Sequence, residues 1–245
     1  MLSLFTIMRR KPRKVGLNSG EVVLTFDDGP NLQDNVTPSL LNVLHRHSVK
    51  VGFCIVGKQV RKHPEVVQRM HRSGHLLINH TTRHKHPLRQ NLKTLIEEVE
   101  QCDREIGTAL GVEDYKSEYF RAPYGIVTPA VRRLTRRLKM TPVLLTHYGW
   151  DTRVGPGNFE PVVDMLIANA KKHRGGMFVF HDGSLCPPFV PTADWNDSTE
   201  NRSWVPEAVD RVVEELKADG LRFVVPQQRE TLPLTSSTVR ERRAA

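Results

Sequence analysis

Apolar runs of strand length alternate with segments of helical periodicity along most of the chain. The strand-like runs are rich in valine, isoleucine and phenylalanine, and the segments between them repeat apolar residues every three or four positions. The predicted strands are Val22–Phe26, Val51–Val56, Leu76–Ile78, Tyr119–Phe120, Val143–Thr146, Met177–Phe180 and Arg222–Val225. The predicted helices are Pro38–His47, Gln59–Arg72, Leu92–Leu110, Pro129–Lys139, Pro161–Lys172 and Pro206–Ala218.

This alternation predicts an α/β fold, because successive parallel strands need a crossover helix between them. Seven strands and six helices fit either an open doubly wound sheet or a closed barrel. The length of 245 residues suits one domain. The one long irregular segment, residues 182–204, is rich in Pro, Asp, Asn and Trp, and a loop of that length in a compact domain is typically functional or mobile.

The net charge of +9 raises the question of a nucleic-acid or membrane partner. Most of that charge lies at the two ends: residues 1–20 carry five basic side chains and no acid, and residues 229–245 carry four arginines and two glutamates. The body, residues 21–228, therefore holds only about two of the nine units. We expect one domain over 21–228 with a basic tail on each side, and no nucleic-acid partner.

Cysteine usage and the N-terminus bear on the compartment. Cys54, Cys102 and Cys186 are too few for a disulfide framework, and Cys54 lies in an apolar run typical of a core. The apolar stretch Leu2–Met8 precedes the basic run, the reverse of a signal peptide, and no run approaches the ~18 apolar residues of a membrane span. We expect a cytoplasmic protein as the sequence stands, and a secreted or envelope-associated one if a leader is missing.

Polar side chains follow five of the predicted strands. Polar groups at the carboxyl ends of several parallel strands are typical of an active site on the open face of an α/β barrel. The pairs and single residues concerned are Asp27-Asp28, His80 with His84, Arg121, Trp150-Asp151 and His181-Asp182.

Each of these motifs also has a structural interpretation. Asp27-Asp28-Gly29-Pro30 reads as a turn, or as two carboxylates pointing different ways, one to a metal and one to a proton. Arg121 fits a surface ion pair or a fixed cation beside a carboxylate. His181 ends an apolar run, where a histidine is more often a satisfied core residue until the other strand ends are considered.

Two histidine pairs have the four-residue spacing that places both rings on one helical face. His80 and His84 follow a predicted strand and are candidate metal ligands, with His86 as a substitute. His71 and His75 surround a predicted helix end, where positive charge suits the last turn, so we interpret that pair as structural.

Taken together, four of these motifs resemble the polysaccharide deacetylase family, that is, the NodB-homology domain of carbohydrate esterase type. They are Thr25–Pro30, Asn79–His84, Phe120–Gly125 and the apolar run that ends in His181-Asp182, in that order. The resemblance covers residues 21–228. It implies an irregular (β/α)7 barrel in a single domain, similar to a TIM barrel.

The resemblance also implies the roles of the site residues. Asp28, His80 and His84 would hold a divalent metal, with zinc the usual ion and cobalt an alternative. Two imidazoles and one carboxylate suit a hydrolytic metal site, because they leave positions open for water and a substrate oxygen.

The implied proton transfers involve four further groups. Asp27 would be the general base for a metal-activated water, and Arg121 would hold Asp27 in place. The backbone N–H of Tyr124 would stabilise the oxyanion, and His181 would protonate the departing amine.

The chain departs from the family pattern after the fifth strand. The family carries an Asp-x-x-Asp-Trp pattern there, whereas this chain has Trp150-Asp151 followed by Val154-Gly155. We expect Asp151 to be the partner of His181. Phe178 and Phe180 flank Val179 where the family has a leucine pocket, which predicts a different or narrower pocket for the acetyl methyl group.

The resulting hypothesis is a metal-dependent hydrolase that removes N-acetyl groups from amino sugars of a chitin- or peptidoglycan-like polysaccharide. The alternatives are a related amidohydrolase acting on another acyl or cyclic amide, and a metal-holding carbohydrate-binding protein without turnover. An iron oxygenase shares the ligand set but is usually built on antiparallel double sheets. Residues 132–139 carry five basic side chains, either a solvated helix face or a contact for an anionic glycan or envelope surface. Oligomeric state is left open.

Overall fold

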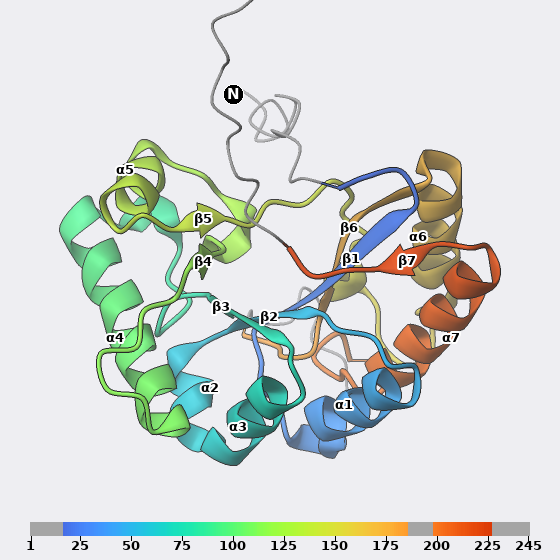
Figure 1. The fold of residues 1–245 in the computed structure, drawn as a ribbon, viewed down its shortest axis with the longest axis horizontal. Coiled ribbons are helices and arrows are strands. Elements are labelled where there is room, and N and C mark those ends of the chain that lie inside the picture. Colours follow the sequence, from blue (N-terminus) through green and yellow to red (C-terminus); the bar gives the residue numbers. More distant parts are fainter. Residues whose placement is uncertain (1–16, 186–197, 227–245) are drawn as a thin grey trace, which may run out of the picture.

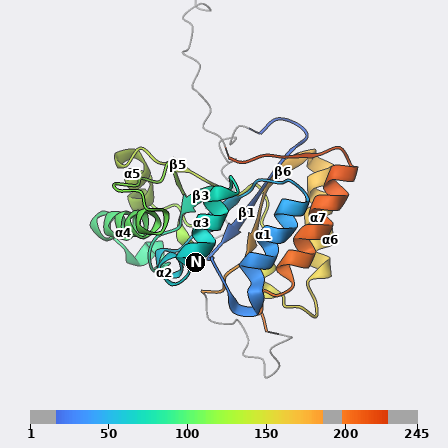
Figure 2. The ribbon, with the colours of Figure 1, turned by 60° about the horizontal axis from the view of Figure 1, so that its bottom comes forward.

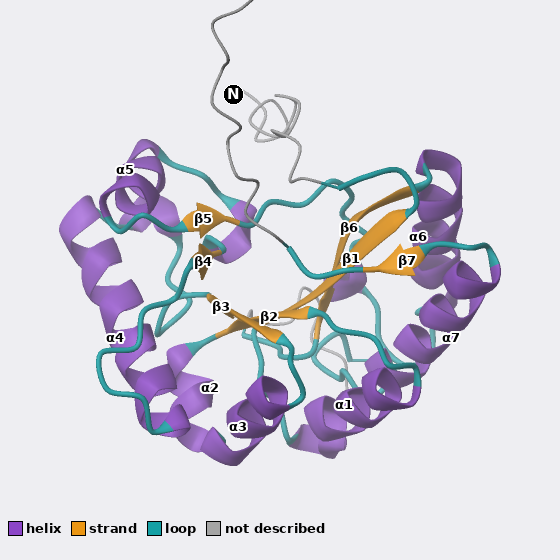
Figure 3. Ribbon diagram, viewed as in Figure 1, coloured by secondary structure: helices purple, strands orange, loops and turns teal. Residues whose placement is uncertain are grey.

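A parallel β-sheet curls around the centre of the molecule, and helices cover its outer face (Figures 1 and 3). The computed structural model describes residues 17–185 and 198–226. The strand order is β5-β4-β3-β2-β1-β6, and β7 pairs with the start of β1. The strands are β1 (Glu21–Asp27), β2 (Gly52–Ile55), β3 (Leu76–Asn79), β4 (Tyr119–Phe120), β5 (Thr141–Pro142), β6 (Gly175–His181) and β7 (Arg222–Phe223).

Seven α-helices lie in the described residues, and Figure 2 shows them around the outside of the curled sheet, with α4 and α5 to one side of the strands and α1, α6 and α7 to the other. They are α1 (Val36–Arg46), α2 (Gly57–Lys62), α3 (Pro64–Arg72), α4 (Leu92–Leu110), α5 (Pro129–Arg137), α6 (Glu160–His173) and α7 (Val205–Ala218). All strand pairs are parallel, so the predicted α/β class with crossover helices is confirmed. None of the described helices is long and apolar enough to cross a membrane.

Two predicted elements were wrong in their extent. The helix predicted over 59–72 is two helices, because Pro64 lacks an N–H and restricts its predecessor; His63 takes φ −136° and ψ 54° between α2 and α3. Residues Val143–Thr146, predicted as a strand, form none; the fifth strand, β5, ends just before them at Pro142. That segment crosses toward β6, where the Met177 N–H donates to the Thr146 hydroxyl at 2.8 Å.

This crossing accounts for the irregularity of the barrel. No strand pairing joins β5 to β6 in the described residues. The Thr146 and His147 N–H groups donate to the Met177 carbonyl at 3.2 and 3.3 Å, and these bonds span the opening where a further ladder would close a regular barrel.

The longest run of strand pairing fixes the position of Asp27 and His181 along the sheet. β1 and β6 pair over seven residues, from Glu21 opposite Gly175 to Asp27 opposite His181. Gly175 has φ +120°, and a Cβ there would lie 2.2 Å from the Glu21 carbonyl oxygen, so only glycine allows this close approach. The ladder therefore places Asp27 and His181 side by side at one edge of the sheet.

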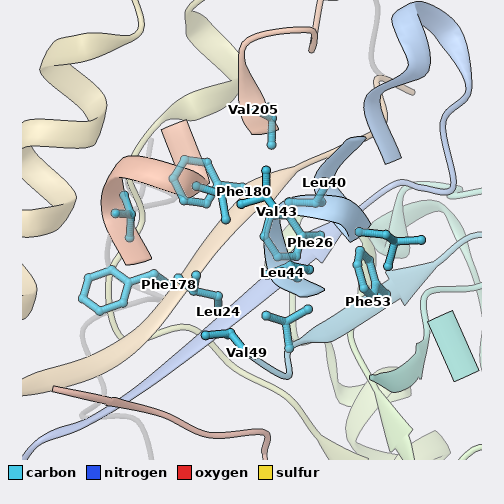
Figure 4. Packing of buried hydrophobic residues seen from close by; sticks show 14 of the residues in the cluster. Leu24, Phe26, Leu40, Val43, Leu44, Val49, Phe53, Phe178, Phe180 and Val205 are labelled. Carbon is cyan, nitrogen blue, oxygen red and sulfur yellow. The ribbon is translucent and has the colours of Figure 1, made fainter. Parts of the chain in front are cut away.

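The main core lies between the outer face of the sheet and the helices (Figure 4). The Phe26 ring lies 5.4 Å from that of Phe53 and 6.1 Å from that of Phe180, and all three are fully buried. Each such side chain contributes about 1.5–3 kcal/mol through burial. This core fixes the strands whose ends carry the site.

Alternation along β6 changes the interpretation of the acetyl pocket. Phe178 and Phe180 point outward into the main core, and Met177 lies in the barrel interior with Cys54. Because successive side chains in a strand face opposite ways, Val179 shares the inner face with Met177 and His181. Val179 is therefore the inward residue two positions before His181, and the different or narrower acetyl pocket stays a prediction.

Other sequence expectations fall partly outside the described residues. Cys54 is buried and free, as expected of a core cysteine. Cys102 is also buried and free, and Cys186 lies outside the described residues. His75 is also buried and receives a hydrogen bond on Nδ1 from the Val51 N–H at 3.3 Å. Of the two expected tails, 1–20 lies outside the described residues up to residue 16, and 229–245 lies wholly outside them. Much of the 182–204 loop also lies outside the described residues.

Candidate active site

Two carboxylates diverge at the end of β1. Asp28 has φ 74°, which turns its side chain away from that of Asp27. The Arg121 guanidinium, from the end of β4, donates to Asp27 Oδ1 at 2.5 Å and to the Thr25 hydroxyl at 2.7 Å. Burial raises the pKa of Asp27, but the positive charge of the Arg121 guanidinium outweighs it and brings the pKa to about 2. Asp27 is therefore an ionised, fixed carboxylate.

Asp28, His80 and His84 form one compact group. All three are buried, and their candidate ligand atoms lie within 4.8 Å of one another. His80 Nδ1 donates to the Arg121 carbonyl at 2.8 Å, which leaves Nε2 facing Asp28 Oδ1 at 3.6 Å. His84 Nε2 lies 3.3 Å from the same oxygen. The structure therefore brings together the three residues expected to bind a metal.

The chemistry of this group fits a divalent metal. Burial lowers the pKa of His80 and of His84 to about 4, so both rings are neutral at physiological pH and have lone pairs to donate. Asp28 Oδ1 is buried and has no hydrogen-bond partner among the described residues. An unpartnered carboxylate oxygen between two neutral imidazoles is costly unless a cation satisfies it.

The turn after β3 is held by hydrogen bonds that sequence reasoning missed. The Asn79 side chain accepts from the Thr81 N–H at 2.9 Å and donates to Asp103 at 2.8 Å. Asp103 in turn accepts from the Ser117 hydroxyl at 2.6 Å. This buried network orients the backbone that presents both histidines. Asn79 belongs to the Asn79–His84 motif, but its partner Asp103 is distant in sequence, so spacing did not predict this contact.

His181 and Asp151 form a second charged pair. The Asp151 carboxylate accepts from the His181 N–H at 2.7 Å and lies 3.0 Å from His181 Nδ1. Burial by itself lowers the pKa of His181, yet the Asp151 charge and hydrogen bond raise it to about 9. At neutral pH His181 is therefore protonated, with Nδ1 directed to Asp151. The structure places Asp151 where the sequence analysis expected the partner of His181.

Tyr124 lies at the exposed side of the metal-ligand group. Its side chain is 44% exposed, and its backbone has φ 57°. The ring lies 4.7 Å from that of His84 and 4.8 Å from that of His86. His86, the substitute ligand of the sequence analysis, is not in the three-residue group and instead packs on Tyr124. Trp150 is 38% exposed, and the Arg153 guanidinium lies 4.1 Å from its ring centre.

The Asp182 carboxylate packs against the turn that follows β1. Its side chain is fully buried and accepts from the Thr37 hydroxyl at 2.5 Å. A Cβ on Gly29 would meet the Asp182 carboxylate at 2.3 Å, so glycine is required beside it. The His181-Asp182 pair was visible in the sequence, but the contact with Thr37 spans 145 residues and was not predictable from spacing.

We expect Asp182→Asn to change the pH dependence of stability. Burial raises the pKa of Asp182 to about 7, above its value in an unfolded chain. Between about pH 4 and pH 7 the folded state holds the extra proton, so this residue's contribution to stability falls as pH rises. Urea unfolding of the variant should show a smaller loss of stability from pH 5 to pH 8 than the wild type. Asp114→Asn, at an exposed position, is the control; equal slopes in both variants would contradict the assignment.

These features together define an irregular parallel α/β barrel with a candidate metal group at the carboxyl edge of its sheet. A family model described as polysaccharide deacetylase matches residues 14–143, more than half of the chain. The chain belongs to the polysaccharide deacetylase family, and the family resemblance and the barrel fold expected from sequence are both confirmed.

Individual relatives agree with the family match. A chitooligosaccharide deacetylase from Sinorhizobium fredii is 32% identical over 183 residues, which cover 74% of this chain and 79% of that protein. A peptidoglycan-N-acetylglucosamine deacetylase from Bacillus cereus is 27% identical over 230 residues, covering 92% and 72%. The solved structure of T48 deacetylase with substrate has a TM-score of 0.66 and 27% identity, covering 83% of this chain and 87% of that one.

Proposed function

We propose that this protein removes N-acetyl groups from amino sugars of a chitin- or peptidoglycan-like polysaccharide, in a reaction that requires a divalent metal. One observation carries the proposal: the Asp28–His80–His84 group lies beside an ionised Asp27 and within electrostatic reach of a protonated His181. A base and an acid on either side of one Lewis-acid site is what hydrolysis of an amide needs. The named deacetylases among the relatives supply the substrate class.

Asp28, His80 and His84 would hold the metal, and zinc suits two imidazoles and one carboxylate. When bound there, such an ion would supply Lewis acidity to an amide carbonyl and to a water molecule. Asp27 accepts the proton that this water loses, through Oδ2, while Arg121 holds its other oxygen. The water oxygen forms the new bond to the acetyl carbon.

Cleavage of the C–N bond involves two other groups of the site, Tyr124 and His181. The Tyr124 backbone N–H would donate to the oxyanion as it develops. The protonated His181 gives a proton to the amide nitrogen as the C–N bond breaks, so the sugar leaves as a free amine and the acyl group as acetate. Asp151 keeps Nδ1 of His181 protonated and directs the other ring nitrogen toward the leaving group.

The test is acetate release from N-acetylglucosamine oligomers and from peptidoglycan. Purified protein should release acetate, lose activity with a chelator, and regain it with added zinc or cobalt. Acetyl-xylan and small cyclic amides serve as comparison substrates. Release of another acyl group with none from the amino sugars would favour the amidohydrolase alternative. Binding of the oligomers with no release from any substrate would favour a binding protein.

A further inference from the structure

One helix face carries a concentration of unpaired positive charge. Five basic side chains lie within the eight residues that include the second half of α5, and all five are exposed. None of them forms an ion pair with an acidic residue in the described ranges 17–185 and 198–226. We call this surface the α5 basic face; it comprises Arg132, Arg133, Arg136, Arg137 and Lys139.

Several basic residues on other helices form ion pairs with acidic residues. Arg46 pairs with Asp210 at 2.8 Å across α1 and α7, and Arg61 pairs with Glu105 across α2 and α4. Arg211 contacts both Asp164 and Glu215. Several exposed arginines therefore meet an acid on a neighbouring helix. Others, such as Arg72, have no ion pair among the described residues, and the α5 basic face differs in gathering five such cations within eight residues.

Helix stability does not account for this arrangement. Positive charge near the C-terminal turn of a helix is favourable, which covers Arg136 and Arg137. Arg132 and Arg133 lie close to the N-terminal end, where positive charge is unfavourable. Each also faces a like charge four residues later, and such pairs cost a few tenths of a kcal/mol, ~0.2–0.5. The sequence tolerates this repulsion without supplying a single acid on the helix.

The fold fixes where this face points. Val131 and Leu134 are buried against the α4 side of the core, so the basic side chains lie on the opposite, outer side of α5. Figure 1 shows α5 on the outside of the sheet beside α4. The helix begins four residues after Gly125, in the loop that carries Tyr124 at the active site. The start of the α5 basic face therefore follows the Tyr124 loop closely along the chain.

We propose that the α5 basic face binds an anionic polysaccharide strand, so that the substrate of this enzyme is an acidic N-acetylated glycan. This inference rests on the proposed function. Guanidinium groups pair with carboxylates in a planar, two-bond geometry, and the α5 basic face presents four of them on one helix. None of the exposed large apolar side chains of the described residues is on α5, so the face lacks the anchors of a membrane-inserting helix.

The test compares two variants with the same change in net charge. Arg133→Glu/Arg137→Glu reverses two charges on the α5 basic face. Lys62→Glu/Arg72→Glu reverses two exposed charges on α2 and α3, where no ion pair is broken among the described residues. The probe is a hyaluronan oligosaccharide, which carries N-acetyl groups and carboxylates, and its affinity is measured by calorimetry at two salt concentrations.

We expect wild-type binding to weaken as salt rises, because exposed charge pairs are screened. The α5 variant should bind about tenfold more weakly, and the matched control should stay within about twofold of wild type. Both variants should deacetylate a neutral chitin oligomer as the wild type does. Arg133→Gln/Arg137→Gln, with a smaller loss expected, checks the result if the glutamate variant is unstable.

Three outcomes would overturn the inference. These are equal losses in the α5 variant and its control, wild-type affinity that does not change with salt, and tighter α5-dependent binding to anionic phospholipid vesicles than to the glycan. If the wild type fails to deacetylate any oligomer, the proposed function fails, but the binding comparison still decides what the α5 basic face does.

Discussion

Replacing His80 with alanine is expected to abolish both metal binding and acetate release. Bound divalent metal per chain should fall from about one to near zero, because the remaining Asp28 and His84 provide only two of the three donors. Acetate release should fall by about 10³-fold or more, since polarisation of the carbonyl by a metal contributes several kcal/mol. Metal content after dialysis and initial rates on chitin oligomers measure the two effects.

His86→Ala provides the matched comparison. His86 is two residues from His84 but packs on Tyr124 and is outside the ligand group. The variant should keep its metal, while any change in rate reports the loss of support for the Tyr124 ring. Metal content that falls in His86→Ala and persists in His80→Ala would mean that the ligand set is different.

The second large effect is expected from Asp151→Asn. At present burial, which lowers the pKa of His181, is outweighed by the Asp151 carboxylate, and the pKa is about 9. Without that charge, burial is opposed only by the attraction of Asp28 and Asp27, so the pKa of His181 falls. A smaller fraction of His181 then carries a proton for the leaving amine at pH 8. We expect acetate release at pH 8 to fall by about 10²–10⁴-fold.

The pH profile distinguishes this role from a structural one. Activity that depends on protonated His181 is present below its pKa and lost above it, so the wild-type alkaline limb should lie near pH 9. In Asp151→Asn that limb should move to lower pH, and part of the rate should return in acidic buffer. Asp114→Asn, at an exposed position, should leave the profile unchanged. A variant with a lower rate at every pH but the same alkaline limb would exclude this role for Asp151.

Local patterns predicted the site residues whose signals lie close together in sequence. Asp27-Asp28 and His80 with His84 each fall within one turn that follows a strand, so a short motif carries both partners. The strand-end rule then placed Arg121 and His181 on the same edge of the sheet, as the β1–β6 ladder and the Arg121–Asp27 contact show.

The remaining parts depend on contacts that spacing does not encode. The Asp182 contact with Thr37 and the hydrogen bond from Arg202 to the Asp151 carbonyl, at 2.7 Å, join segments far apart in the chain. The outward direction of Phe178 required knowledge of which face of β6 lines the barrel. Pro64, by contrast, carried a readable local signal, because proline inside a helical pattern ends the helix before it.

The most direct test of the account is Asp27→Asn in the metal-loaded protein. Asp27 is outside the ligand group but beside it, and the amide cannot take the proton of the attacking water. We predict that this variant retains one divalent metal per chain, binds chitin oligomers, and releases almost no acetate. Acetate release at the wild-type rate from metal-loaded Asp27→Asn would contradict the account.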